Sequence, residues 1–481
     1  MRRLVAVLLA LVLLLVGYGA LDVLDLAPGI LTRDAATGPL PEPEPTGTQT
    51  AGPAPTLPRT DDTATPLQAA ALSAPVPAPT VLRRELADEL AAPALGDSIG
   101  VTVRDAFTGD HLLDIDAERP RVPASTAKIL TALAVGVTLD PATTLPTRVV
   151  QGRSPSEIVL VAGGDSLLAR GKGSPTAVAG RAGLGDLAGQ VATALQAAGT
   201  GAVTVRLDMT YAAGPRYAPG WTTADVDAGF TQGVSMLGLA SQRPRPGKPS
   251  PSVSEDAVLE AFLAALGKAG ITAKAAPDGT RALAAAADAA ELGRVESAPV
   301  GDILALALDD SDNALTESLA RQASVQAGGG AGFEAATALV RRTVAGLGVD
   351  LSGVRLKDTS GLTSGQAIPA RVLGDVLALG ASGTVPSMRD TLSQLPVAGL
   401  DGTLYDRFDE PGSRSAAGLA RAKTGTLTGA SSLAGTVVDR DGRVLTFAVV
   451  ADRVPGGFPG TVAARAALDR FVAALASCGC R

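Results

Sequence analysis

The chain has 481 residues, of which 46% are hydrophobic, 19% are charged and only 3% are aromatic, and its formal net charge is -7. This length is enough for two or three domains, and the apolar residues can fill a large core with Ala, Val and Leu side chains. The acidic balance argues against a nucleic-acid partner, because proteins that bind nucleic acids usually carry a basic surface.

The first 30 residues have the pattern of an export segment. Met1–Arg3 is positively charged, and Leu4–Val16 is an uninterrupted apolar run. The run is shorter than the roughly 20 residues that a membrane-spanning helix needs, and Tyr18 is unfavourable for cleavage after Ala20. We therefore expect residues 1–30 to be either a signal peptide or a signal anchor. The rest of the chain should lie outside the cytoplasm, with membrane contact only through this segment.

Residues 31–80 are predicted to be a linker rich in Pro, Ala and Thr. Eleven of the chain's 33 prolines fall between Asp34 and Thr80. Such a composition favours extended backbone and buries too little apolar surface to fold. The folded part is therefore expected to begin near Val81.

The segments that follow have clear helix and strand patterns. Leu82–Ala91 has helical spacing, Ser98–Asp105 and His111–Ile115 alternate around a turn, and Thr126–Ala134 has the pattern of a buried helix. Near the C-terminus the pattern predicts a hairpin with an Asp-Gly turn and then a closing helix, over Leu433–Val438, Val444–Val450 and Ala463–Ala476.

The middle of the chain differs in composition. Residues 151–295 are rich in Gly, Pro and Ala and contain only short strand-like runs, such as Glu157–Val161. We expect these residues to be an inserted accessory module, and residues 81–150 and 296–481 to form one domain together. The two flanks contain all the candidate catalytic residues.

Three short motifs carry the chemistry, and they occur in the order S-x-x-K, S-x-N and K-T-G. In an Ala/Ser/Thr-rich chain each motif alone could be a coincidence. Lysine is scarce, however: the chain has only seven, and two of them fall inside the motifs. No other Ser precedes a Lys by three positions. The order and this scarcity favour an active site over coincidence, formed by Ser125-Thr126-Ala127-Lys128, Ser311-Asp312-Asn313 and Lys423-Thr424-Gly425.

Histidine, cysteine and metal chemistry are poor alternatives. The single histidine, His111, lies in a predicted hairpin fourteen residues before Ser125, so a Ser-His-Asp triad is not expected. Cys478 and Cys480 sit at the end of the chain, where they could be a strained pair, free thiols or an intermolecular bridge, and we expect no catalytic role for them. No metal and no cofactor is predicted.

These motifs, and several longer segments, resemble those of the D-alanyl-D-alanine carboxypeptidase/endopeptidases of the low-molecular-mass class C penicillin-binding proteins. The 182 residues between Lys128 and Ser311 are similar to that family's large insertion. The chain departs from the family's pattern at two places. Ser166 replaces a Pro, and Ser364-Gly365-Gln366 replaces Arg-x-Asn in a loop that could therefore bind substrate differently. The similar segments are Leu160–Leu167, Leu207–Tyr211, Pro219–Trp221, Asp358–Thr363 and Leu395–Leu404.

The resemblance implies a fold, an activity and partners. The fold is α+β, with a five-stranded antiparallel sheet flanked by helices and interrupted by one or two small domains. The activity is hydrolysis of peptidoglycan peptides that end in D-Ala-D-Ala, with β-lactam antibiotics as covalent inhibitors. Within the same chemistry a β-lactamase remains an alternative, although the long insertion and the lack of a recognisable glutamate motif argue against it. A non-catalytic scaffold that binds peptidoglycan is the alternative from another class.

The motifs suggest a role for each residue. Ser125 is expected to be the nucleophile at a helix N-terminus, and Lys128, three residues on, its base if burial and a second cation lower the lysine pKa. Ser311 would relay a proton to the leaving amine. Asn313 would bind the acyl-side amide and hold Lys128, or it could cap a helix.

The third motif is expected to bind substrate. Lys423, with Thr424, would bind the terminal carboxylate and supply the second cation. The backbone N–H groups of Ser125 and Thr426 would form the oxyanion site. Gly425 would leave room for the substrate backbone, or could be a plain bulge. Among the aspartates, Asp312 is expected to be a solvated turn residue. Asp165 and Asp208 are expected to be turn or cap residues, with contact to a substrate amine as the alternative.

Overall fold

The computed structural model describes residues 73–251 and 254–479. The predicted signal segment, nearly all of the predicted linker and Cys480 lie outside the described residues. Cys478 is disulfide-bonded. Within these described ranges, no helix is both long enough and apolar enough to cross a membrane.

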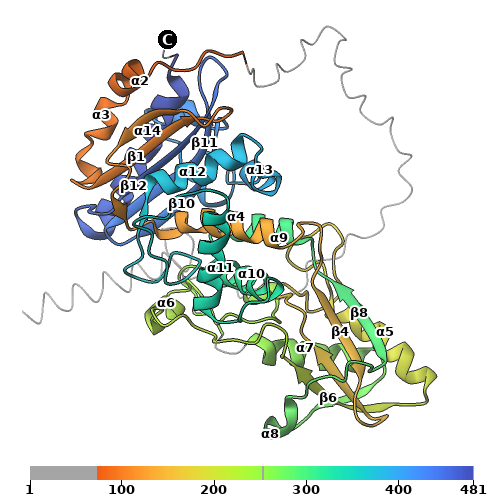
Figure 1. Ribbon diagram of the computed structural model, residues 1–481. Coiled ribbons are helices and arrows are strands. Elements are labelled where there is room, and N and C mark those ends of the chain that lie inside the picture. The colour runs from red at the N-terminus through yellow and green to blue at the C-terminus, as the bar shows by residue number, and fades with distance from the viewer. Residues whose placement is uncertain (1–72, 252–253, 480–481) are drawn as a thin grey trace, which may run out of the picture. The chain divides into compact units, whose positions relative to one another are not determined.

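Strands from both ends of the described chain form one antiparallel sheet (Figure 1). Its order is β10–β11–β12–β1–β2, so the early strand β1 pairs with the last strand β12, with Val101 opposite Val449. This is the five-stranded antiparallel sheet that the resemblance implied. The strands are β1 Ile99–Asp105, β2 His111–Ile115, β10 Ala420–Leu427, β11 Ala430–Val438 and β12 Val444–Ala451.

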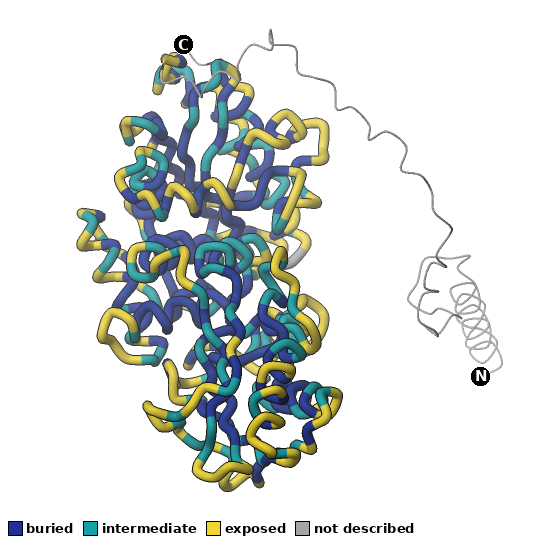
Figure 2. The backbone as a smooth tube through the Cα atoms, turned by 90° about the vertical axis from the view of Figure 1, so that its right-hand side faces the viewer, coloured by how far each residue is buried: buried dark blue, intermediate teal, exposed yellow. Residues whose placement is uncertain are grey.

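Helices cover both faces of this sheet. Phe447 packs toward α14 (Gly457–Ser477), where its ring lies 6.5 Å from that of Phe471. The next residue, Ala448, belongs to the other core, which includes α12 (Ala370–Ala381). Successive side chains of a strand point to opposite faces of the sheet. Because helices cover both faces, both sets of alternating residues are apolar. The backbone of the central strands is accordingly buried (Figure 2).

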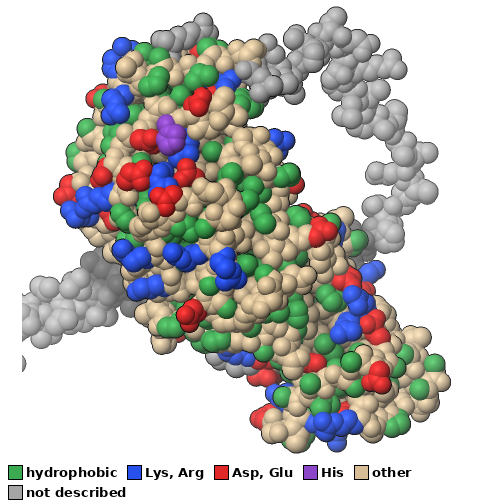
Figure 3. Space-filling model, viewed as in Figure 1, with side chains coloured by type: hydrophobic (Ala, Val, Ile, Leu, Met, Phe, Trp, Pro, Cys, Tyr) green, Lys and Arg blue, Asp and Glu red, His purple; other side chains and the backbone are tan. Residues whose placement is uncertain are grey.

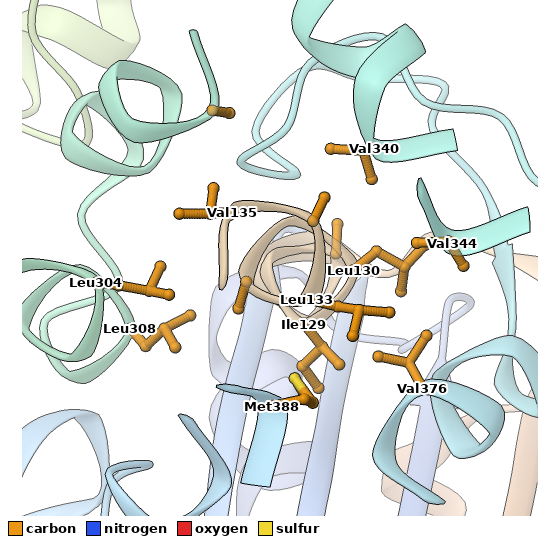
Figure 4. Packing of buried hydrophobic residues seen from close by; sticks show 14 of the residues in the cluster. Ile129, Leu130, Leu133, Val135, Leu304, Leu308, Val340, Val344, Val376 and Met388 are labelled. Carbon is orange, nitrogen blue, oxygen red and sulfur yellow. The ribbon is translucent and has the colours of Figure 1, made fainter. Parts of the chain in front are cut away.

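Helix α4 (Lys128–Thr138) lies at the centre of the helical core (Figure 4). Eight of its eleven residues are buried, as expected for a helix that is apolar on all sides. Ile129, Leu130 and Leu133 are surrounded by side chains from the neighbouring helices. The neighbours are α9 Val300–Asp309, α10 Asn313–Gln326, α11 Phe333–Gly346, α12 and α13 Pro386–Ser393.

A second five-stranded sheet, ordered β7–β6–β5–β4–β8, has its own apolar core. Its parallel pairs β5–β6 and β6–β7 are connected through α5 (Leu184–Ala197) and α7 (Ser254–Lys268), because parallel neighbours need a crossover. Strand β4 runs across the predicted boundary after Val150, and the division into domains remains a prediction. The strands are β4 Pro146–Gln151, β5 Glu157–Val161, β6 Ala202–Asp208, β7 Thr272–Ala275 and β8 Glu291–Glu296.

Short elements complete the described fold. Two of them, β3 and β9, form a small antiparallel pair, and α3 packs on α14. The elements are α2 Pro79–Glu85, α3 Ala87–Leu90, η1 Pro93–Leu95, β3 Pro120–Arg121, η2 Ala124–Ala127, α6 Thr223–Asp227, η3 Ala240–Gln242, α8 Asp278–Arg281, β9 Ile368–Pro369, η4 Gly402–Leu404 and η5 Arg414–Ala416.

Candidate active site

The three motifs meet at one cleft of about 870 Å³. Residues from each motif line it, although the motifs lie far apart in the sequence. The cleft is bounded by η2, by the turn between α9 and α10, and by β10, which is an edge strand of the first sheet. The motif residues that line it, with Thr426 that follows the third motif, are Ser125, Ser311, Asp312, Asn313, Thr424 and Thr426.

Ser125 lies in the 3₁₀ turn η2, one turn before α4. The residue before it, Ala124, has a φ of +47°, a conformation that side chains other than Gly rarely adopt. Gly361 approaches the Ala124 carbonyl so closely that a Cβ would overlap the oxygen, and its φ of +88° also favours Gly. A strained backbone that the surroundings hold in place is typical of functional sites.

Lys128 is fully buried and points at Ser125. Its Nζ donates to Ser125 Oγ at 2.9 Å, to Asn313 Oδ1 at 2.5 Å and to the Ser360 carbonyl at 2.7 Å. Burial lowers the pKa of Lys128 to about 8, against the opposing charges, of which Asp358 is the largest. An amine with this pKa is partly neutral near neutral pH and can accept a proton from the hydroxyl that it contacts.

The second motif forms the turn between α9 and α10. Ser311 has a φ of +54° and lies on the cleft surface. Asn313 is held from two sides, because its Oδ1 accepts from Lys128 and its Nδ2 donates to the Phe230 carbonyl at 2.8 Å. Its side chain therefore faces the site and does not cap the helix.

Asp312 corrects one expectation. We expected a solvated turn residue, but it is buried and is the N-cap of α10, accepting from Leu315 N at 3.0 Å. Its other oxygen accepts from Arg243 at 3.0 and 3.1 Å. Arg243 reaches the turn from a segment about 70 residues earlier, so sequence spacing gave no sign of the pair. The contact fixes the turn that carries Ser311 and Asn313.

Lys423 does not line the cleft, but it shares the face of β10 that packs, through Gly425, on the turn carrying Ser125. Its side chain is fully buried, and Nζ donates to the Thr424 carbonyl at 2.9 Å. Burial lowers the pKa of Lys423 well below its usual range, the positive charge of Lys128 adds to this effect, and Asp309 opposes it. Lys423 and Lys128 therefore interact electrostatically, and the expected contact of Lys423 with the substrate carboxylate stays a prediction.

Contacts within the protein require a glycine at position 425. A Cβ at this position would overlap Ser432 Oγ and lie 2.6 Å from the Pro123 carbonyl oxygen. Gly425 thus allows β10 to pack closely on the turn that carries Ser125, and the expected room for a substrate backbone stays a prediction. On the other face of β10, Thr424 Oγ1 bonds Thr403 Oγ1 at 3.1 Å.

Glu317 was missed by sequence reasoning. It is buried in α10, and it accepts from Thr359 N at 2.7 Å, Ser360 N at 2.8 Å and Thr359 Oγ1 at 2.7 Å. These bonds fix the Ser360 carbonyl that accepts from Lys128. Burial raises the pKa of Glu317 to about 8 and Asp358 adds to this, whereas the three donors oppose it. Its position one turn into a helix after the S-x-N motif offered no recognisable signal.

Asp358 organises the loop that departs from the family pattern. Its carboxylate accepts from Gly361 N and Thr363 N, both at 2.7 Å, and from Gln366 Nε2 at 2.6 Å. It also accepts from Trp221 Nε1 at 3.0 Å. Gln366 is buried and supports the loop, and it does not line the cleft.

The remaining candidates lie away from the cleft. Asp165 accepts from Leu167 N at 2.7 Å, and Asp208 accepts from Thr210 N at 2.9 Å, as turn residues do. His111 is exposed on β2, at the sheet edge opposite β10, where it contacts Asp114 at 2.6 Å (Figure 3). In the part of the chain that the structure describes, no group of three His, Cys, Asp or Glu residues is placed to hold a metal ion.

Comparison with known proteins identifies the family. The sequence matches the D-Ala-D-Ala carboxypeptidase 3 (S13) family over residues 82–243 and 250–475. This chain belongs to that family. The S13 family assignment agrees with the resemblance noted in the sequence and makes the protein a hydrolase of the peptidase class.

Two relatives of this chain are mycobacterial carboxypeptidases. The chain is 38% identical to carboxypeptidase DacB of Mycolicibacterium smegmatis over 416 residues, which cover 85% of this chain and 86% of the relative. It is 35% identical to a carboxypeptidase of Mycobacterium tuberculosis over 458 residues, covering 93% and 92%.

A solved structure has the same fold. Penicillin binding protein 4 of Haemophilus influenzae superposes with a TM-score of 0.64 at 18% identity, covering 82% of this chain and 97% of that one. The same protein has also been solved in complex with a β-lactam, with a TM-score of 0.59 at 19% identity, covering 81% and 97%. At this identity the likeness shows the fold alone.

Proposed function

We propose that this S13 family peptidase is a serine-type D-Ala-D-Ala carboxypeptidase that acts on peptidoglycan stem peptides through an acyl-enzyme. With a cross-linked peptide as acyl donor, the same chemistry makes it an endopeptidase. The observation that carries the proposal is the 2.9 Å contact from Lys128 Nζ to Ser125 Oγ, made by a buried lysine whose pKa is lowered to about 8.

The acylation step follows from this pair. Neutral Lys128 takes the proton of Ser125, and Oγ attacks the carbonyl carbon of the penultimate D-Ala. The backbone N–H groups of Ser125 and Thr426 receive the developing oxyanion. Ser311 relays the proton from Lys128 to the departing nitrogen, and the terminal D-Ala leaves as a free amino acid.

Hydrolysis completes the cycle. Water attacks the ester of Ser125, the peptide leaves with a new carboxylate, and the Ser125 hydroxyl is restored. Asn313 holds Lys128 during both steps and presents its amide to the acyl side of the peptide. Lys423 contributes through its charge, because a second buried ammonium close to Lys128 favours the neutral form of one of them.

The same site should react with β-lactams. A β-lactam offers a strained amide that Ser125 can open to give a covalent ester, and the Haemophilus influenzae protein that shares the fold has been solved with such a compound. A β-lactamase would in addition need an efficient base for water, and no Glu is among the cleft-lining residues that the structure describes. Thr424 and Thr426 are proposed to bind the end of the substrate, with Gly425 packing the strand against η2.

The proposal is tested by labelling with fluorescent penicillin and by assaying D-alanine release from an acyl-D-Ala-D-Ala peptide. Stable labelling together with release is the expected result. Transient labelling with β-lactam turnover would indicate the β-lactamase alternative, and the absence of both label and release would indicate a non-catalytic scaffold.

Location and domain organisation are also proposed. The charged and apolar start of the sequence, together with a peptidoglycan substrate, supports a site of action outside the cytoplasm, with residues 1–30 as signal peptide or anchor. The separate sheet and apolar cluster formed largely by residues 151–295 support an accessory module inserted into the peptidase domain. Cell fractionation with and without residues 1–30, and limited proteolysis, test these two points.

A further inference from the structure

Arg465 of α14 reaches the cleft beside β10. Its Nε donates to Thr426 Oγ1 at 3.3 Å, and the residue lines the cleft wall. Over the described residues the guanidinium forms no ion pair, because the carboxylate of Asp469, one turn further along α14, is engaged by Arg407 at 2.8 Å. A cation without a partner anion therefore lies at the strand edge.

Charged groups of both signs surround this cation. Arg407 adds positive charge and Asp406 and Asp469 add negative charge, while burial lowers the pKa of Arg465 from its usual value. A half-buried guanidinium that has lost part of its hydration gains from an anion with two oxygens, since the planar fork matches a carboxylate.

Strand geometry separates Arg465 from Lys423. Thr424 and Thr426 are two residues apart on β10 and share one face, whereas Lys423 and Gly425 share the other. Both threonines line the cleft, as do Thr461 and Arg465 on one side of α14, but Lys423 does not. Thr426 Oγ1 thus accepts from Arg465, whereas Thr424 Oγ1 accepts from Lys423 Nζ at 3.4 Å.

We propose that Arg465, together with the hydroxyls of Thr424 and Thr426, binds the free C-terminal carboxylate of the substrate. The inference rests on the proposed function and specifies how that site selects its substrate. Lys423 then acts on the charge state of Lys128, and Arg465 of α14 binds the carboxylate.

The test compares two substrates in the wild type and two variants. Release of D-alanine from acyl-D-Ala-D-Ala and release of D-alaninamide from the same peptide with a C-terminal amide are measured for wild type, Arg465→Gln and Arg465→Lys. Arg465→Gln should lower kcat/KM for the acid about 10- to 100-fold, mainly through KM, because a charge-assisted bond is lost. The amide should change little, and Arg465→Lys should give an intermediate acid-to-amide ratio.

A matched control lies on the same helix. Arg470→Gln removes an arginine that pairs with Glu89 away from the cleft, and its acid-to-amide ratio should equal that of wild type. An equal loss for both substrates in Arg465→Gln, or an unchanged ratio, would overturn the inference while leaving the proposed function intact. A wild-type enzyme that released neither product would overturn both. Penicillin labelling of each variant confirms that the site has folded.

Discussion

Lys128 and Asn313, 185 residues apart in the sequence, are joined by a 2.5 Å hydrogen bond from Nζ to Oδ1. The same Nζ donates to Ser125 and to the Ser360 carbonyl, so three acceptors fix its position. Each acceptor comes from a different segment of the fold. The lysine is thus held against one hydroxyl, that of Ser125.

Replacing Ser125 with Ala should abolish both penicillin labelling and D-alanine release, because no other hydroxyl contacts Lys128 Nζ among the described residues. Intact mass spectrometry after incubation with penicillin measures the covalent adduct directly. Ser382→Ala, at an exposed serine outside the cleft, is the control and should label like wild type. A penicillin adduct on the Ser125→Ala protein would refute the assignment of the nucleophile.

The acylation rate should rise with pH through about 8, the value to which burial lowers the pKa of Lys128. The sign follows from the role of a base, which must be neutral: below this pH Lys128 is protonated and cannot accept the Ser125 proton. Stopped-flow acylation with a fluorescent penicillin measures the profile. Lys128→Ala should slow acylation by ~10²–10⁴-fold, the usual loss for a general base.

Two variants control this pH experiment. His111→Ala should leave the rate and the profile unchanged, because His111 lies at the far sheet edge. Glu317→Gln should keep the rise but move it to lower pH, because the charge of Glu317 raises the pKa of Lys128; this separates Lys128 from the neighbouring carboxyl, whose pKa is also raised to about 8. A wild-type rate that does not change with pH would contradict Lys128 as the base. So would a rise with pH that disappears in Glu317→Gln.

Glu317 should matter through the hydrogen bonds that it accepts. Glu317→Ala leaves two backbone N–H groups and the Thr359 hydroxyl buried without their acceptor, which should cost about 2–4 kcal/mol of unfolding free energy. In Glu317→Gln the remaining oxygen can still accept from both N–H groups, so the loss should be smaller. Urea unfolding measures the loss of unfolding free energy, and the rate of penicillin labelling measures the effect on the site. Equal losses of unfolding free energy in Glu317→Ala and Glu317→Gln would show that the charge of Glu317, and not the hydrogen bonds that it accepts, stabilises the fold.

Gly425→Ala should slow labelling and lower stability by about 1–3 kcal/mol, because a Cβ overlaps Ser432 Oγ and crowds the Pro123 carbonyl. Gly267→Ala in α7 is the matched control, since nothing lies within 4 Å of its Cβ position, and it should stabilise the helix slightly. Thermal unfolding and penicillin labelling are the measurements. Wild-type behaviour of Gly425→Ala would mean that β10 and η2 are not closely packed.

Local sequence was enough to predict several of the elements and to locate the three motifs. The strand from His111 to Ile115 and the helix after Ser125 follow from apolar spacing, which depends only on near neighbours. The hairpin of β11 and β12 follows from its alternating residues and its Asp-Gly turn. The resemblance added the five-stranded sheet, which requires knowledge of how distant strands pair.

Only the tertiary structure decided which charges face the cleft. The motif spacing could not tell that Lys423 donates to Thr424, that Arg243 pairs with Asp312, or that Glu317 holds the carbonyl that Lys128 contacts. Arg465 has no motif at all, and it meets Thr426 because α14 packs on the face of the sheet that carries the threonines. Burial and hydrogen bonding between segments far apart in the chain depend on how the layers pack, so the residues that tune this site appear only when the sheet and its helices are assembled.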